Sequence, residues 1–251
     1  MAVVLLASCA KETDGLTSEG SSDEKTNPKS QVFSELGEQH NAILEYAIGE
    51  VDFKTDSIPV LAALDAIKNM NWDFSQSQID LNTFMEMSLD TYSLMDSLGC
   101  KVAHWSQNPY SVQATVILQN TLNIFKNVQG VSNIDIIYSN LDDLRNVARN
   151  QLSGDELSAV INTIDVAKSS AYFWAPIDIG GLGYWDYCNE QKAWNWGNAV
   201  LGDAWGSLSY WTGVGVVGIV AATVPGPNVA IFTGWACATA IGSVAGGFGL
   251  K

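Results

Sequence analysis

Apolar residues recur at helical spacing through most of residues 33–172. In the stretch 34–51 they share one helical face, and Ser34 stands where an N-cap is expected. Comparable stripes recur over residues 56–70, 80–99, 110–130, 131–152 and 153–176. Alternation typical of strands is rare and short. The pattern therefore predicts an all-α fold that begins with an N-terminal helical bundle.

Residues that start and stop helices divide these stripes. Pro59 falls in the first turn of a predicted helix, and Gly130 and Pro176 follow the ends of two others. Ser153 and Glu156 have the spacing of a capping box, in which each side chain bonds the backbone N–H of the other residue. These signals predict helix boundaries near residues 58, 130, 153 and 176.

The pattern changes after Pro176. From Gly206 to Leu250 the chain has no charged side chain, and a turn at Pro225–Pro227 divides this segment into two stretches, about 206–223 and 228–250. At about 1.5 Å per helical residue, the first stretch would extend about 27 Å, close to the thickness of a bilayer core. The sequence thus predicts a Gly/Trp-rich apolar helical hairpin over residues 206–250. Such a hairpin could be a buried core, a membrane anchor or a membrane-active segment.

Charge and aromatic residues follow the same division. Residues 10–149 carry 20 acidic and nine basic side chains, and seven of the nine tryptophans lie after residue 170. The net charge of the whole chain is −15, which makes nucleic acid an unfavourable partner. We therefore expect an acidic, polar front half and an apolar, aromatic back half.

Catalytic motifs are not found. The sequence has no G-x-S-x-G, no HExxH, no Walker loop and no Gly-rich dinucleotide turn. His40 and His104 are isolated, so each is interpreted as a satisfied or an exposed histidine rather than a metal ligand. The acidic pair Asp142 and Asp143 suits a solvated helix face. We expect no enzyme activity, no cofactor and no metal site.

The N-terminus carries a specific motif. An apolar run ending in Leu6-Ala7-Ser8-Cys9 resembles the lipobox of bacterial lipoproteins, which implies removal of residues 1–8 as a signal peptide and lipid attachment to Cys9. No basic region precedes this run, so the signal peptide is expected to be incomplete. Residues 9–32 are rich in Ser, Gly and charged residues, which is typical of a flexible tether. The residues after Cys9 resemble those of outer-membrane lipoproteins exported to the cell surface in Bacteroidota.

Two cysteines lie in the C-terminal region, Cys188 and Cys237. They are either joined in a disulfide, which the predicted compartment would permit, or are small buried side chains. No CxxC spacing indicates a zinc site.

Small and aromatic residues mark the predicted hairpin. Tryptophan rings suit a membrane–water interface, and glycines allow close helix approach in lipid at a cost to helix stability in water. The region 184–251 resembles the glycine-zipper, Trp-bearing segments of bacteriocins and small pore-forming peptides, which implies that it acts on membrane lipid. The residues that carry this interpretation are Trp205, Trp211, Gly213, Gly218, Trp235, Gly242 and Gly246.

Two arginines, Arg145 and Arg149, stand near the junction of the two halves, in a chain with ten lysines and no further arginine. In one interpretation they belong to a solvated helix face and pair with Asp142 and Asp143. In the other they are the sites at which an arginine-specific protease separates an acidic helical masking domain, residues 33–149, from a releasable toxin region, residues 150–251.

The order of lipobox, helical domain, lone basic cut site and Gly/Trp-rich tail resembles the proteolytically activated lipoprotein bacteriocins of gut Bacteroidales. The resemblance implies a clostripain-like activating protease, secretion of the C-terminal fragment and a target-cell receptor that the sequence does not identify. Two alternatives stay open. One is a non-toxic helical binding or structural lipoprotein with a buried hairpin, and the other is an immunity-type outer-membrane protein anchored by the hairpin.

Overall fold

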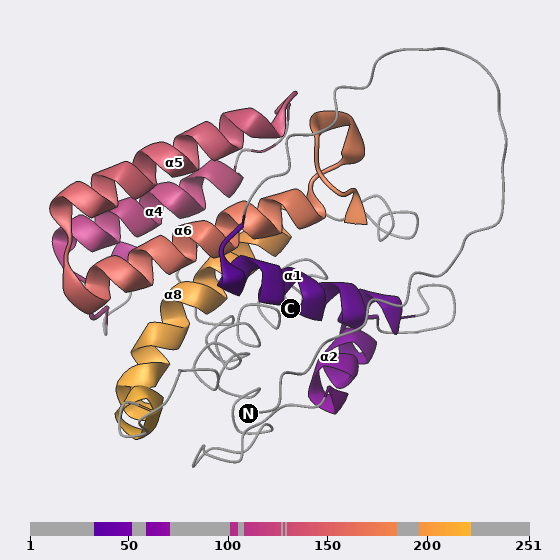
Figure 1. The fold of residues 1–251 in the computed structure, drawn as a ribbon, viewed down its shortest axis with the longest axis horizontal. Helices are drawn as coiled ribbons and strands as arrows, with labels where there is room; N and C mark the ends of the chain where they lie inside the picture. Colours follow the sequence, from indigo (N-terminus) through magenta and orange to yellow (C-terminus); the bar gives the residue numbers. More distant parts are fainter. Residues whose placement is uncertain are drawn as a thin grey trace, which may run out of the picture. The chain divides into compact units, whose positions relative to one another are not determined.

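The computed structural model describes residues 33–51, 59–70, 101–104, 108–126, 128, 130–184 and 196–221, with side chains in the last range as far as Leu208. This part of the chain is 81% helical and has six α-helices and no strand, which confirms the predicted all-α fold. The α-helices, drawn in Figure 1, are α1 (Glu35–Gly49), α2 (Pro59–Asn69), α4 (Val112–Lys126), α5 (Ile134–Gln151), α6 (Gly154–Trp174) and α8 (Trp196–Ala221). Two short 3₁₀ helices, η1 (Val102–His104) and η2 (Ile177–Ile179), complete the elements.

Helix boundaries follow local chemistry at several predicted positions. The Ser34 hydroxyl accepts the N–H of Gly37 at 3.2 Å, so the predicted N-cap of α1 is confirmed. α2 begins at Pro59, whose missing N–H costs nothing in a first turn. α6 ends just before Pro176, also as predicted. The predicted helix over residues 80–99 lies outside the described residues.

The predicted capping box at the start of α6 is wrong. Ser153 precedes the helix in extended conformation, but its side chain makes no capping hydrogen bond. Glu156 is engaged elsewhere: its Oε1 accepts the backbone N–H of Ser111 at 2.6 Å, and its Oε2 accepts the Ser111 hydroxyl at 3.0 Å. A tertiary contact with the start of α4 therefore replaces the local one, since a carboxylate bonds both groups of Ser111 at once.

Helix α6 is the central element of the described part. It packs against α1, α4, α5 and α8, and Figure 1 shows α4, α5 and α6 side by side, with α8 crossing α6. Small side chains make these approaches close. Buried small residues of α6 are Ala159, Thr163, Ala167, Ser169, Ser170 and Ala171. At Gly37 of α1 an added Cβ would lie 2.7 Å from the Cβ of Ser169, so this crossing requires glycine.

The first half of α8 is enclosed on all sides. Every residue from Trp196 to Leu208 is buried except Asn198. Trp205, which the sequence suggested for a membrane interface, is 1% exposed and belongs to the core. Residues 196–208 are thus buried on nearly every side, and this half of α8 presents no continuous polar face.

Helix α8 begins ten residues before the predicted hairpin and includes Asp203. Within the described ranges, none of the helices combines the length and the apolar character that crossing a bilayer requires.

Several predicted features lie outside the described residues. These are the signal peptide and tether, the turn and second arm of the hairpin, and the residues Cys9, Cys188, Trp235, Cys237, Gly242 and Gly246. Trp211, Gly213 and Gly218 fall in α8, where the backbone alone is described. The predicted boundary between residues 149 and 150 lies within the last turn of α5, and the described helices on both sides of it share one core.

Candidate functional site

Three buried polar side chains meet where α1, α6 and α8 come together. His40 of α1, Ser170 of α6 and Asp203 of α8 are each 0% exposed. His40 Nε2 lies 3.0 Å from Asp203 Oδ1, at ion-pair distance but without the alignment of a hydrogen bond. The Ser170 hydroxyl donates a short hydrogen bond to Asp203 Oδ2. On its other side, His40 Nδ1 lies 3.0 Å from Asn41 Oδ1.

This cluster does not have the order of a nucleophilic triad. In Ser–His–Asp enzymes the histidine lies between the serine and the acid, so that it can take the serine proton. Here Asp203 lies between Ser170 and His40, and solvent reaches none of the three. The arrangement can hold helices together, because a buried carboxylate needs a cation and hydrogen-bond donors.

The sequence interpretation of His40 as a satisfied or an exposed histidine holds only in part: the residue is buried, its Nδ1 lies beside Asn41 Oδ1, and its Nε2 faces Asp203 without an aligned hydrogen bond. The interpretation missed Asp203. Two signals were available. His40 occupies the apolar face of its helix, in line with Leu36, Leu44 and Ala47, and Asp203 is the lone charge in an apolar stretch. His104, in η1, is exposed. No group of three metal-binding side chains is placed together among the described residues.

A second set of hydrogen bonds holds α1 to α6 beside this cluster. Asn41 Nδ2 donates to the backbone oxygen of Ser169 at 3.1 Å, and the Ser169 hydroxyl donates to the backbone oxygen of Gly37 at 2.8 Å. These bonds span 128 and 132 residues of sequence, so neither could be read from local pattern.

The two arginines have different surroundings. Arg145 lies within α5, its side chain is 32% exposed, and its Nη2 is 3.2 Å from Asp165 Oδ2 on α6. Arg149 lies in the last turn of α5 and is exposed. The interpretation that Arg145 pairs with acids on its own helix is therefore wrong, because the facing helix supplies the acid.

Two further contacts hold α5 to α6. Lys168 Nζ donates to both carboxylate oxygens of Asp142 at 2.8 and 2.9 Å, and it lies 5.2 Å from the centre of the Tyr138 ring. Burial raises the pKa of Asp165, while the neighbouring Arg145 and Lys168 act in the opposite direction. Two ion pairs and a cation–π contact thus join α5 and α6 into a helical hairpin.

Contacts to α8 also come from the segment before α4. The Tyr110 hydroxyl donates to the backbone oxygen of Leu208 at 2.5 Å, and burial raises the pKa of Tyr110, with Glu156 adding to the effect. From α6, the hydroxyls of Thr163 and Ser207 lie 3.1 Å apart. α8 is thereby bonded to elements on both sides of the arginines.

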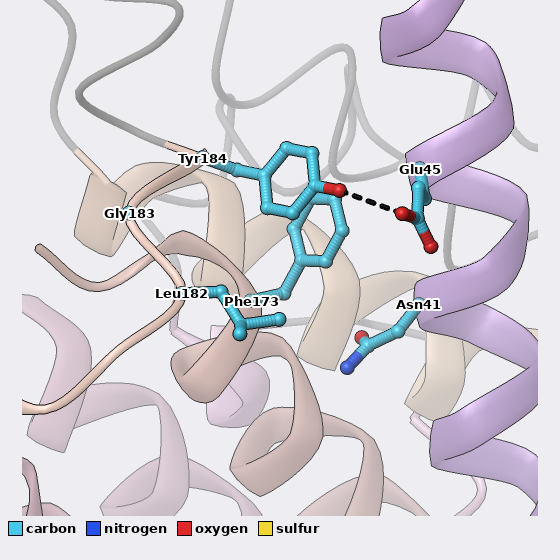
Figure 2. A pocket seen from close by; sticks show the side chains of 6 residues that line it. All are labelled: Asn41, Glu45, Phe173, Leu182, Gly183 and Tyr184. Carbon is cyan, nitrogen blue, oxygen red and sulfur yellow. Dashed lines mark hydrogen bonds between the residues drawn. The ribbon is translucent and has the colours of Figure 1, made fainter. Parts of the chain in front are cut away.

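A hollow of about 490 Å³ opens beside α1 (Figure 2). The chain folds back after η2, and Tyr184 stacks on Phe173 with ring centres 4.0 Å apart. The Tyr184 hydroxyl donates to Glu45 Oε1 at 2.9 Å, as Figure 2 shows, and Asn41 bonds α6. Because its polar side chains already bond within the protein, we assign no ligand to this hollow.

Comparison of the chain with protein-family models, with curated proteins and with solved structures finds no match in any of the three.

Proposed function

We propose that the chain is the precursor of a lipid-anchored antibacterial toxin, activated by cleavage after an arginine of α5. The cut detaches residues 150–251 from the front part of the chain; they include α6, α8 and the uncharged segment that continues to Leu250. The released fragment acts on a bacterial membrane. Before the cut, the acidic helices of residues 33–149 keep this fragment folded and in water.

The burial of residues 196–208 of α8 is the main support for this proposal. Helix α6, which makes the most extensive contact with α8, belongs to the same fragment, whereas α4 and His40 of α1 lie before the cut. Loss of the front helices would remove part of the cover from a helix that has no polar face. Apolar surface of this kind needs another apolar environment, such as a membrane.

The surroundings of the arginines favour Arg149 as the cut site. A protease needs its substrate locally unfolded, and helix ends open more readily than helix interiors. Cleavage after Arg149 requires opening of the last turn of α5, which ends at Gln151 and continues into extended residues Leu152 and Ser153. Cleavage after Arg145 also requires loss of its contact with Asp165.

The compartment follows from the N-terminal motif. A lipid on Cys9 and a tether through residue 32 would place the precursor on the outer membrane, at the cell surface. A clostripain-like protease would meet its substrate there. A membrane anchor in the hairpin would be redundant with the lipid, and this favours a hairpin that is released.

The test is cleavage followed by membrane leakage. The purified full chain is treated with an arginine-specific protease, its products are weighed by mass spectrometry, and dye release is measured from vesicles of phosphatidylethanolamine and phosphatidylglycerol. The uncut chain should release little dye and the cut chain much more. Arg149→Lys keeps the charge but removes the preferred site, so it should delay both cleavage and leakage, whereas Arg145→Lys serves as the matched control.

Leakage that is equal before and after the cut would contradict the proposal. Retention of full leakage in the double variant Arg145→Lys/Arg149→Lys, treated in the same way, would also contradict it.

The burial of residues 196–208 favours one other candidate, a binding or structural lipoprotein in which the hairpin is permanent core. That protein would resist the protease and would leave vesicles intact under every condition.

A further inference from the structure

The buried pair of His40 and Asp203 joins helices on opposite sides of the proposed cut. His40 belongs to α1, before Arg149, and Asp203 belongs to α8, after it. We propose that this pair is a latch that keeps residues 150–251 attached to the front helices after cleavage, so that cutting and release are separate steps. This inference rests on the proposed cleavage in α5.

Because both side chains of the latch are buried, separating them is costly. Both side chains are 0% exposed, and His40 Nε2 and Asp203 Oδ1 are 3.0 Å apart. Removing one partner of a buried pair leaves the other charge in a poorly solvating interior, which costs far more than an exposed pair contributes. Separation of the fragments is therefore resisted until Asp203 can reach water or another partner.

Asp203 lies at a position in the sequence where one contact can hold the uncharged segment. It is the last charged residue before residues 204–250, which carry no charge. Apart from Lys251 at the C-terminus, Asp203 is thus the one charged residue next to these uncharged residues through which the front helices can hold them. Apolar contacts alone are non-directional, whereas a buried pair of polar side chains fixes one arrangement of α8.

The surrounding contacts support the same interface. Ser170 donates to the second oxygen of Asp203 and stays with it after the cut, because both belong to residues 150–251. Asn41, next to His40, bonds the backbone of Ser169 in α6. The bonds from α1 therefore join that helix to α6 and α8 together, in addition to the bonds that Tyr110, Ser111, Asp142 and Arg145 make across the cut.

A two-step activation follows. Cleavage by itself yields a nicked complex whose front helices still cover α8. Release requires another apolar surface that can bind the uncharged residues 204–250, and the lipid of a target membrane provides one. The latch would thereby delay exposure of the fragment until it meets lipid.

The experiment measures retention of the fragment in nicked protein. The full chain is cut, diluted in buffer without lipid, and passed over a size-exclusion column to determine the fraction of residues 150–251 that remains with the front. Wild type should elute as a complex. His40→Leu should retain its fragment about 100-fold less tightly, or worse, which is the scale of breaking a buried pair. Glu38→Gln, on an exposed position of the same helix, is the control and should behave as wild type.

The double variant His40→Leu/Asp203→Leu decides between a specific pair and general damage to the core. Because an apolar pair can replace a buried ion pair, it should restore retention to within about tenfold of wild type. Should His40→Leu fail to fold, a folded and retaining double variant still supports the pair. The latch is overturned if His40→Leu retains its fragment as Glu38→Gln does, or if the double variant is no better than the single one.

The two proposals fail separately. Fragments that separate as predicted but release no dye from vesicles contradict the toxin function and leave the latch standing. Dye release from a nicked wild type whose fragments part immediately in buffer contradicts the latch alone.

Discussion

The contribution of the buried pair to folding can be measured in the uncut chain. In His40→Leu, the carboxylate of Asp203 stays at 0% exposure and loses its imidazole partner. Breaking a buried pair in this way typically costs about 3–5 kcal/mol. In a protein of this size each kcal/mol lowers the melting temperature by about 2–4 °C, so we expect a decrease of about 6–20 °C.

Thermal and denaturant unfolding, followed by circular dichroism, would measure this cost. His40→Leu/Asp203→Leu should recover most of the lost stability, because both polar partners are removed together. Non-additivity of at least about 2 kcal/mol between the single and double variants is the expected signature of direct coupling. A single variant that costs less than about 1 kcal/mol, or additive effects of the two substitutions, would refute the reasoning.

Three further predictions concern other contacts. Gly37→Ala should destabilise the protein by about 1–3 kcal/mol because its Cβ would collide with Ser169, whereas Gly49→Ala, with no atom within 4 Å, should be neutral or stabilising in the same unfolding assay. Burial raises the pKa of Asp165, so the native state binds the proton of this carboxyl group more tightly than the unfolded chain does. The contribution of Asp165 to stability therefore falls as pH rises from about 3.9 through the raised pKa. Asp165→Asn should flatten that part of the pH–stability curve. Tyr110→Phe should cost about 0.5–1.5 kcal/mol in denaturant unfolding, since it removes the side-chain hydrogen bond to the backbone oxygen of Leu208; a cost near zero would contradict the role given to this bond.

Local signals predicted helices well in this chain. The N-cap at Ser34 and the boundaries at Pro59 and Pro176 depend on groups within a few residues, and the structure has them where the pattern placed them. The capping box failed for a physical reason: Glu156 finds a better partner in Ser111, which lies 45 residues away. A local motif predicts a local bond when no tertiary partner competes for the same oxygen.

The candidate site was less predictable because its contacts are distant in sequence. His40 and Asp203 come from the first and last described helices, and no periodicity in either helix specifies the other. The sequence did contain one polar residue on the apolar face of α1, His40, and one in the apolar first half of α8, Asp203. A polar side chain at such a position needs a buried partner. The pairing of Arg145 with Asp165 was missed likewise, since the facing helix competes with acids on its own helix.

The central claim is that cleavage in α5 turns an inactive precursor into a killing agent. The most direct measurement is survival of a related target strain exposed to equal amounts of uncut wild type, protease-cut wild type and protease-treated Arg145→Lys/Arg149→Lys. The account predicts killing by cut wild type and survival in the other two conditions. Killing by the uncleavable variant equal to that by cut wild type, or survival under all three, would contradict it.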